Sequence, residues 1–254
     1  MVRAKKHLGQ HFLKEASVAE RTAKLAMKGD TRSWLEIGPG TGMLTQFLLG
    51  ESVDLKCIEV DSESVEFLHE NYPLLEVIEG DFLNLDLVNM FNGEFGVIGN
   101  FPYNISSQIV FRILESRGRI PEFIGMFQLE VAQRIAASSG SKTYGILSVL
   151  TQAFYDVNLE FRISPGNFNP PPKVQSGVLR AVRKDDFTLD CNETLFLDVV
   201  KTAFQQRRKT LGNALRKFNI PKEQVLQDQI FKLRAEKLEV SDYVHITRMI
   251  QESR

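Results

Sequence analysis

The stretch GNFPYNIS at residues 99–106 follows a short apolar run and places an amide beside two aromatic rings and a proline. An amine on a heteroaromatic ring, such as that of adenine, is a weak nucleophile because its lone pair is delocalised. The side-chain oxygen of Asn100 and a backbone carbonyl held by Pro102 could both accept hydrogen bonds from such an amine, directing its lone pair toward a methyl donor. The ring of Tyr103 could stack on the base. The stretch thus predicts methyl transfer to a planar amine, with catalytic roles for Asn100, Phe101, Pro102 and Tyr103.

A glycine-rich loop at residues 35–45, LEIGPGTGMLT, favours this chemistry over a plain strand-to-helix turn. The loop follows an apolar strand and opens a helix, which is where α/β proteins bind nucleotides. Gly38, Gly40 and Gly42 let the backbone pass close to a ligand and take positive φ. A dinucleotide fingerprint would place its third glycine one residue later, where this chain has Met43. The spacing therefore disfavours nicotinamide and flavin dinucleotides.

Three acids, Glu36, Glu59 and Asp81, fall at or near the ends of predicted strands. The carboxyl ends of parallel strands share one edge of a sheet, so we expect these acids near the glycine-rich loop. A carboxylate can accept hydrogen bonds from both ribose hydroxyls, while another polar side chain reads an adenine amine. The pattern predicts S-adenosylmethionine as methyl donor. The alternative is a tight glycine turn with solvated acids at the strand ends.

Short apolar runs alternate with helically periodic segments between about residues 17 and 163, which is typical of a parallel α/β sheet. The strands are predicted at residues 33–38, 54–60, 74–80, 95–100 and 122–128. The helices between them are predicted at residues 42–50, 61–72 and 106–117. Two later segments, at residues 155–163 and 176–183, are expected to add an antiparallel pair to the sheet edge.

The strand pattern stops near residue 187, and three amphipathic segments follow at residues 193–205, 209–218 and 240–251. We therefore predict an α/β domain over residues 1–186 and a small all-helical domain over residues 187–254.

The composition limits the class of protein further. With 254 residues and 43% apolar side chains, the chain can bury a substantial core. No apolar run approaches the roughly 18 residues of a membrane span, and the N-terminus lacks the apolar core of a signal peptide, so we expect a cytoplasmic protein without membrane contact. Cys57 and Cys191 are too few for a disulfide framework or a zinc site, and we expect no metal.

The charge is unevenly distributed although the net charge is only -1, which argues against a protein that simply coats nucleic acid. Residues 201–217 contain six basic residues and no acid. Such a run is often a solvated helix face, but in a near-neutral protein it predicts a local contact with RNA phosphates. The residues expected to bind RNA there are Arg207, Arg208 and Lys209.

Several motifs together resemble the ribosomal RNA adenine dimethyltransferases, a family that methylates two adjacent adenosines of small-subunit rRNA. The motifs are GQHFL (9–13), LEIGPGTGMLT (35–45), IEVD (58–61), EGDFL (79–83), GNFPYNIS (99–106), FNPPPKVQSGV (168–178) and FQQRRKTLGNAL (204–215). The resemblance covers nearly the whole sequence. Two departures are His11, where the family often has Asn, and Phe101, where it often has Leu; each keeps a polar group or an apolar body in place.

The resemblance implies a Rossmann-like S-adenosylmethionine-dependent methyltransferase sheet followed by a small helical domain that contacts RNA. It implies that the substrate is the 3′-terminal hairpin loop of 16S rRNA in the small (30S) subunit or its precursor, with a link to subunit biogenesis, and we expect a monomer. The cofactor contacts of the family fall on His11, Leu13, Gly38, Glu59, Asp81 and Asn100.

The target adenine must leave its stack to reach such a pocket. Tyr103 is one candidate for stacking on the adenine. Phe168 is the other, because the prolines that follow it would restrict the conformations of its loop. The alternative for Phe168 is that it fills the core beneath a rigid turn.

Other functions stay open at this point. One is methylation of adenine in 23S rRNA, as in antibiotic resistance, which would use the same chemistry. DNA-adenine or protein-glutamine methylation is less consistent, because those enzymes usually have a second proline where this chain has Phe101. A third is a ribosome-assembly or RNA-binding factor in which methylation is secondary.

Overall fold

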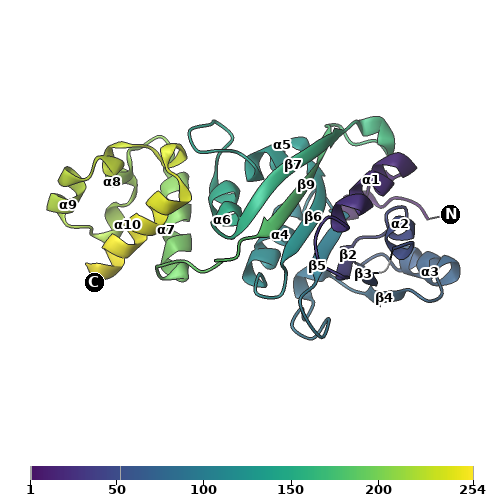
Figure 1. Cartoon of the computed structure of the whole chain (residues 1–254). Helices are drawn as coiled ribbons and strands as arrows, with labels where there is room; N and C mark the ends of the chain where they lie inside the picture. The colour runs from purple at the N-terminus through teal and green to yellow at the C-terminus, as the bar shows by residue number, and fades with distance from the viewer. Residues whose placement is uncertain (1, 52, 254) are drawn as a thin grey trace. The chain divides into compact units, whose positions relative to one another are not determined.

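A computed structural model of the chain describes residues 2–51 and 53–253 and divides into two compact units (Figure 1). Unit 1 is formed by the chain up to residue 132 and by residues 156–183. Unit 2 is formed by residues 133–155 and by the chain from residue 184 onward. Residues 133–155 were predicted to belong to the first domain. They group with unit 2 because the helix within them packs against other helices of that unit.

Unit 1 is built on a seven-stranded sheet with the order β4-β3-β2-β5-β6-β9-β7. Neighbours from β4 through β6 run parallel, and β9 joins β6 in antiparallel orientation. The strands are β2 Ser33–Ile37, β3 Asp54–Glu59, β4 Glu76–Glu79, β5 Gly96–Asn100, β6 Glu122–Gln128, β7 Tyr155–Ile163 and β9 Ser176–Arg183. The predicted parallel α/β sheet with an antiparallel addition is confirmed.

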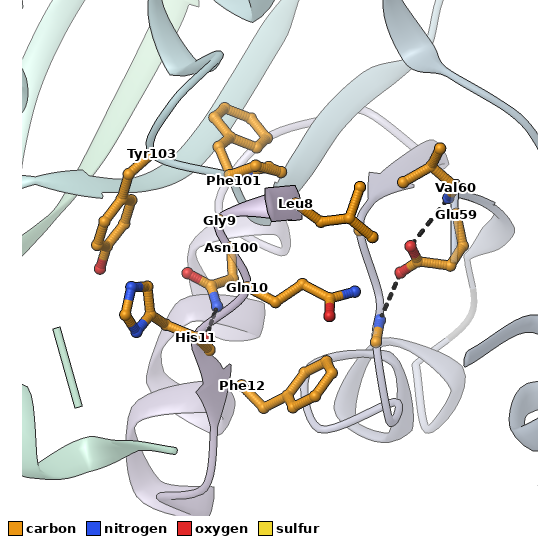
Figure 2. Close-up of a pocket in the computed structure, with 13 residues that line it drawn as sticks. Leu8, Gly9, Gln10, His11, Phe12, Glu59, Val60, Asn100, Phe101 and Tyr103 are labelled. Atoms are coloured by element: carbon orange, nitrogen blue, oxygen red, sulfur yellow. Dashed lines mark hydrogen bonds between the residues drawn. The ribbon is translucent and has the colours of Figure 1, made fainter. Parts of the chain in front are cut away.

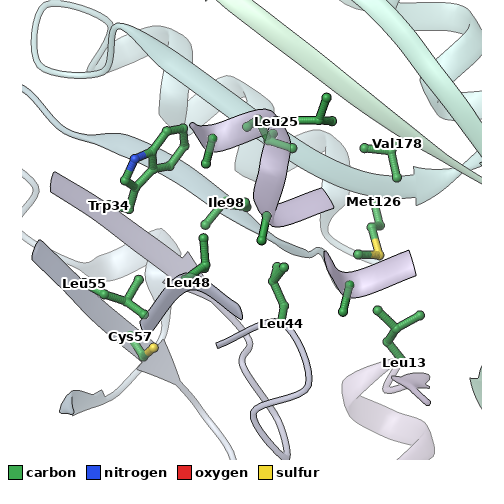
Figure 3. Packing of buried hydrophobic residues seen from close by; sticks show 14 of the residues in the cluster. Leu13, Leu25, Trp34, Leu44, Leu48, Leu55, Cys57, Ile98, Met126 and Val178 are labelled. Carbon is green, nitrogen blue, oxygen red and sulfur yellow. The ribbon is translucent and has the colours of Figure 1, made fainter. Parts of the chain in front are cut away.

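The middle of the sheet is almost continuously apolar because parallel strands are covered on both faces. Every residue of β2 after Ser33 is buried. Trp34, Ile98 and Met126, from three different strands, belong to one buried cluster that also contains Leu48 (Figure 3). This core holds the strand ends at fixed relative positions.

The helices of unit 1 are α1 Ala16–Ala26, α2 Thr45–Leu49, α3 Ser62–Asn71 and α4 Ser106–Glu115. A further helix, α5 Leu129–Ile135, crosses from unit 1 into unit 2. Helix α1 packs on α2 and β6, and α3 packs on β3 and β4. The carboxyl ends of β2, β3 and β5 each lead through a short loop into α2, α3 and α4, so these three loops meet at one edge of the sheet.

A second, two-stranded sheet joins distant parts of the sequence. Strand β1 Phe12–Leu13 pairs antiparallel with β8 Phe168–Asn169, with Leu13 opposite Phe168. No local sequence pattern predicted this pairing, because each strand has only two residues. It brings the GQHFL motif against the FNPPPKVQSGV motif.

Unit 2 is helical, with α6 Ile146–Phe154, α7 Glu193–Gln205, α8 Leu211–Ala214, α9 Lys222–Gln227 and α10 Val240–Glu252. Helix α7 packs against α6 and α10, and the ring of Phe204 lies 6.1 Å from the rings of both Tyr144 and Tyr243. The predicted helices at 193–205 and 240–251 are confirmed. The one predicted at 209–218 is divided between α8 and a 3₁₀ turn, Arg216–Phe218. Helix α9 was missed because it has only six residues, too few for an apolar pattern of helical period to repeat.

Further 3₁₀ turns lie at Lys6–Leu8, Phe82–Asn84, Pro165–Asn167, Gln229–Lys232 and Ala235–Lys237. Across the described residues, no helix has the length and apolarity that crossing a bilayer requires.

Candidate functional site

A pocket lies at the carboxyl ends of β2, β3 and β5 (Figure 2). Tyr103 and His11 lie at one end of it, Glu59 and Val60 at the other, and Asn100 between them. The pocket is lined by residues 8–12, by Gly38 and Gly40, by Glu59 and Val60, and by residues 100–103. It therefore brings together His11, Gly38, Glu59 and the four predicted catalytic residues, which come from distant parts of the sequence.

The glycine-rich loop has the backbone that the sequence predicted. Gly38, Gly40 and Gly42 all have positive φ, at 66°, 57° and 78°. A Cβ on Gly40 would lie 2.7 Å from the ring of Phe12, so glycine is required there for the N-terminal segment to pack closely. A Cβ on Gly38 would meet no atom nearer than the Asn100 carbonyl oxygen at 4.0 Å. Gly38 therefore leaves room for a ligand between the loop and Asn100.

Glu59 ends β3 and is only 4% exposed. Its Oε2 accepts a hydrogen bond from the Gly40 N–H at 3.1 Å, and its Oε1 accepts from the Val60 and Asp61 N–H groups at 2.9 and 3.0 Å. Burial raises the pKa of Glu59, while these three hydrogen bonds act to lower it. A carboxylate has about four acceptor positions. About one, on Oε2, is thus left for a ligand hydroxyl.

Asn100 is the last residue of β5, and its side chain has a defined orientation. Its Nδ2 donates a hydrogen bond to the backbone carbonyl of His11 at 2.8 Å. A carbonyl oxygen can only accept, so the amide nitrogen must face His11 and Oδ1 must point elsewhere. The side-chain oxygen is therefore the atom left to accept a hydrogen bond from a ligand.

The rings of His11 and Tyr103 are stacked, with centroids 5.4 Å apart and planes inclined by 27°. The Nδ1 of His11 lies 2.7 Å from the Pro170 carbonyl oxygen, which means that this nitrogen carries a proton and donates. The hydroxyl of Tyr103 hydrogen-bonds to Oγ of Ser176. Two flat side chains therefore stand beside the amide of Asn100, each fixed by a hydrogen bond to the segment around β8 and β9.

The N-terminal arm, defined as residues 5–13, forms one wall of the pocket. Lys5 forms ion pairs with Asp61 and Glu63, and Gln10 Nε2 donates to Asp61 Oδ2 at 3.3 Å. Burial alone would raise the pKa of Asp61, but hydrogen bonds from Lys5, Ser64 and Gln10 hold it below its ordinary value. The arm is thus fastened to the end of β3, and through β1 to β8.

Sequence reasoning identified only His11 and Leu13 within this arm. It missed four pocket-lining residues next to them: Leu8, Gly9, Gln10 and Phe12. Three of them, Gly9, Gln10 and Phe12, belong to the GQHFL motif, which was their signal, whereas Leu8 precedes the motif and had none.

Three predicted residues lie outside the pocket or contribute only indirectly. Leu13 is buried in the core cluster and pairs with β8. Asp81 is exposed after β4, where its carboxylate accepts hydrogen bonds from the Leu83 N–H and the Asn84 side chain. Phe101 is 1% exposed and packs edge-on against Phe127, so it supports the pocket from behind.

The structure corrects the expectation for Phe168. Its side chain is 1% exposed and belongs to the same buried cluster as Leu13. A buried ring cannot present its face to a base, and the alternative that Phe168 fills the core describes this structure. Tyr103 is the predicted stacking residue that does line the pocket.

Glu36 was expected beside the other acids but is buried in β2 beneath the glycine-rich loop. Its Oε2 accepts hydrogen bonds from Thr45 Oγ1 at 2.7 Å and from Cys57 Sγ at 3.7 Å. Burial, with a smaller contribution from the nearby charge of Glu59, raises the pKa of Glu36 to about 7 in spite of these two donors. Glu36 therefore supports the loop rather than facing a ligand.

The predicted RNA-binding residues lie in unit 2 just after α7 and differ in their surroundings. Arg207 donates to the Lys142 carbonyl at 2.7 Å and lies 3.6 Å from Glu236, so it is partly committed to internal contacts. Arg208 and Lys209 are exposed, and Lys209 donates to Gln206. Arg208 and Lys209 are thus the more available cations. Over residues 2–51 and 53–253, no group of three or more metal-ligating side chains gathers.

Comparison with known sequences gives consistent matches over the full chain. The model of the ribosomal RNA adenine dimethylase family matches residues 1–252. The chain is similar to the ribosomal RNA small subunit methyltransferase A of Flavobacterium johnsoniae, with 55% identity over 254 residues, 98% of this chain and 97% of the relative. It is also similar to the protein of the same name from Cytophaga hutchinsonii, with 48% identity over 254 residues and 98% of both chains.

Comparison with solved structures gives the same fold. A dimethyladenosine transferase from Plasmodium falciparum superimposes with a TM-score of 0.82 at 24% identity, over 95% of this chain and 98% of the other. The 23S rRNA methyltransferase ErmE superimposes with a TM-score of 0.73 at 23% identity, over 94% of this chain and 99% of the other. The predicted Rossmann-like methyltransferase fold is confirmed by these likenesses.

Proposed function

Because the chain belongs to the ribosomal RNA adenine dimethylase family, we propose that it dimethylates the N6 amines of two adjacent adenosines in the 3′-terminal hairpin loop of 16S rRNA. As a member of this family the chain is a methyltransferase. The observation that carries the proposal is the amide of Asn100, whose oxygen is directed away from His11 in a pocket shared with the glycine-rich loop and Glu59.

The residues of the pocket fit S-adenosylmethionine, which supplies an electrophilic methyl group on a sulfonium when bound. Gly38 leaves space beside the loop, and Glu59 keeps about one acceptor position for a ribose hydroxyl. No glycine spacing for a pyrophosphate is needed, since this nucleoside carries none. His11 and Gln10 close the same space from the arm. Asp81 and Leu13 take a supporting role, by shaping the adjoining loop and holding the arm.

The acceptor amine would enter between Tyr103 and Asn100. Oδ1 of Asn100 and a backbone carbonyl next to Pro102 accept its two N–H groups, which makes the nitrogen more tetrahedral and aims its lone pair. The ring of Tyr103 stacks on the base and offsets part of the free energy of unstacking it, which is a few kcal/mol. No general base is required, because the nitrogen becomes cationic on methylation and then releases a proton to solvent.

The RNA substrate is proposed to be held in the small (30S) subunit or its precursor, with Arg208 and Lys209 on phosphates and Arg207 in support. The two relatives of about half identity are both named for the small subunit. The resemblance to ErmE, at 23% identity, shows the fold and does not favour a 23S substrate. We place the enzyme in the cytoplasm, where subunits are assembled. We propose a monomer, since one chain supplies every residue that lines the pocket.

Methyl transfer to isolated ribosomal subunits tests this proposal. Small subunits from a strain that lacks the modification would be incubated with the protein and methyl-labelled S-adenosylmethionine, with large subunits as the matched control. We expect label in the RNA of small subunits alone, at four methyl groups per subunit, as two dimethylated adenosines require. Label in large subunits alone would establish the 23S activity instead, and binding of small subunits without transfer would indicate an assembly factor.

A further inference from the structure

Tyr103 is held at several points, one of which connects it to a distant strand. Its hydroxyl hydrogen-bonds to Oγ of Ser176, the first residue of β9. Its backbone carbonyl accepts a hydrogen bond from Ser106 Oγ at 3.2 Å, at the start of α4. One face of its ring stacks on the ring of His11. The ring is therefore fixed at its backbone end, at its hydroxyl end and on one face.

Ser176 is itself a rigid anchor. Its side chain is 0% exposed, and it lies opposite Gln128 in the β6–β9 ladder. The next residue, Gly177, has so little space around it that a Cβ would lie 2.9 Å from Leu159. Because the hydroxyl of Ser176 is held in place by its strand, its hydrogen bond fixes the position of the Tyr103 hydroxyl.

We propose that Ser176 is a positioning residue for methyl transfer, which holds the ring of Tyr103 in the place where the target base stacks. This inference rests on the proposed role of Tyr103 in the reaction. Tyrosine has two side-chain torsions. The hydrogen bond to Ser176 at the far end of the ring restricts the first, and the stacked ring of His11 restricts the second, before the base arrives. Pre-ordering one such side chain favours the productive complex by roughly three- to tenfold.

The hydrogen bond between Tyr103 and Ser176 also gives a role to the FNPPPKVQSGV motif, most of which does not line the pocket. The FNPPPKVQSGV motif places Phe168 in the core and Ser176 behind Tyr103, and neither side chain needs to touch the ligand. Pro170 in the same segment accepts the hydrogen bond from His11. The segment thus orients both stacked rings from outside the pocket.

A double-mutant cycle tests the proposal, with Ser176→Ala, Tyr103→Phe and the double variant assayed on small subunits. We expect kcat to fall roughly three- to tenfold in each single variant and no further in the double, because all three lack the same hydrogen bond. Binding of S-adenosylmethionine, measured by calorimetry, should be unchanged. Tyr103→Phe keeps the ring and removes only the hydroxyl, so the test stands even where Ser176→Ala fails to fold.

The matched control is Ser148→Ala on α6, since Ser148 is also 0% exposed and donates its hydroxyl to a backbone carbonyl, that of Arg134. It should lower Tm without lowering kcat. Tyr103→Ala separates the stacking role of Tyr103 from the positioning role of Ser176. Should Tyr103→Ala lower kcat while Ser176→Ala and Tyr103→Phe leave it intact, the role of Ser176 is overturned and the proposed function stands. If the losses of kcat in Ser176→Ala and Tyr103→Phe multiply in the double variant, the role of Ser176 is overturned as well. No loss in Tyr103→Ala would remove both the stacking role of Tyr103 and this inference.

Discussion

At the scale of single residues, the chemistry depends on which atom of the Asn100 amide faces the pocket. One hydrogen bond, from Nδ2 to the His11 carbonyl, decides this. Dimethylation adds a further demand, because the amine attacks twice and has only one N–H left after the first transfer. The pocket must then accept a methyl group near either Oδ1 of Asn100 or the adjacent carbonyl, while the remaining hydrogen bond still orients the lone pair.

Asn100→Ala is expected to keep the fold and to lose about 100-fold or more in methyl transfer, or about 2.7 kcal/mol of transition-state stabilisation. The product that still forms should be mostly monomethylated, since orientation is hardest to maintain for the second attack. Single-turnover rates and nucleoside mass spectrometry measure both effects. Asn71→Ala is the matched control, because it removes an amide-to-carbonyl hydrogen bond of 2.8 Å outside the pocket. Normal yields of dimethyladenosine from Asn100→Ala would make this residue a strand-end cap.

At the scale of elements, the N-terminal arm connects the pocket to the rest of unit 1. Lys5→Met should loosen it, because the ion pairs with Asp61 and Glu63 are lost while the arm residues that line the pocket stay unchanged. We expect dissociation of S-adenosylhomocysteine to become roughly three- to fivefold faster and less sensitive to salt, as for a partly exposed ion pair. Stopped-flow dissociation measures this. Lys24→Met removes the ion pair with Glu20 on the surface of α1 and should have no effect. A dissociation rate in Lys5→Met equal to that of the unaltered protein would show that the ion pairs of Lys5 are not needed to hold the arm.

Strand β2 carries a titratable group beneath the glycine-rich loop. The pKa of Glu36 is raised to about 7 from an ordinary value of 4.5. Below pH 4.5 the carboxyl is protonated in both the folded and the unfolded chain. Between these two values the folded chain keeps a proton that the unfolded chain has lost. The contribution of Glu36 to the free energy of unfolding therefore falls as pH rises toward 7, by on the order of 3 kcal/mol in all.

Glu36→Gln should remove this contribution to the pH dependence and make the protein more stable than the unaltered chain at pH 8. Denaturant unfolding at pH 5, 6, 7 and 8 gives the free energy of unfolding of both proteins. The difference between the two at each pH isolates Glu36, because Glu59 is present in both. Glu66→Gln on the exposed face of α3 is the control and should follow the unaltered chain. Parallel curves for Glu36→Gln and the unaltered protein would mean that Glu36 is ionised in the fold.

At the scale of the whole molecule, a near-neutral chain gathers six of its 31 Lys and Arg residues within residues 201–217, a stretch that contains no acid. Arg208→Gln with Lys209→Gln should weaken binding of small subunits and lower the slope of log K against log salt by roughly 1.5 to 2, since each phosphate contact releases about one counterion. Cofactor binding should not change. Lys24→Gln with Lys28→Gln makes the same change in net charge in unit 1 and serves as the control. A salt slope that stays the same would assign this segment to solvent.

Much of unit 1 could be predicted from the sequence, because its strands and helices are each specified by a pattern of neighbouring residues. Each buried parallel strand is a short apolar run in the sequence. Because the carboxyl ends of parallel strands share one edge of a sheet, Gly38, Glu59 and Asn100 could be predicted to lie close together. The pairing of β1 with β8 could not be predicted, because two residues at each side carry no pattern. The same is true of Lys5, whose partner is 56 residues away.

Other errors concern residues whose neighbours in the sequence would be the same whether the side chain is exposed or buried. An aromatic residue before prolines can face solvent or the core, and only packing places Phe168 inside. Glu36 and Glu59 both lie at or near the end of an apolar run, yet Glu36 supports the loop from below and Glu59 faces the pocket. Residues 133–155 contain an apolar helix that could cover a sheet or other helices, and the structure groups it with unit 2.

The central claim is that the pocket methylates the N6 amine of adenosine twice, and the identity of the modified nucleoside tests it most directly. RNA from small subunits treated with the protein and S-adenosylmethionine would be digested and analysed by mass spectrometry against untreated subunits. We predict N6,N6-dimethyladenosine at two adjacent positions near the 3′ end of 16S rRNA. A methyl group on any other atom, or single methylation at saturating enzyme and long incubation, would contradict it.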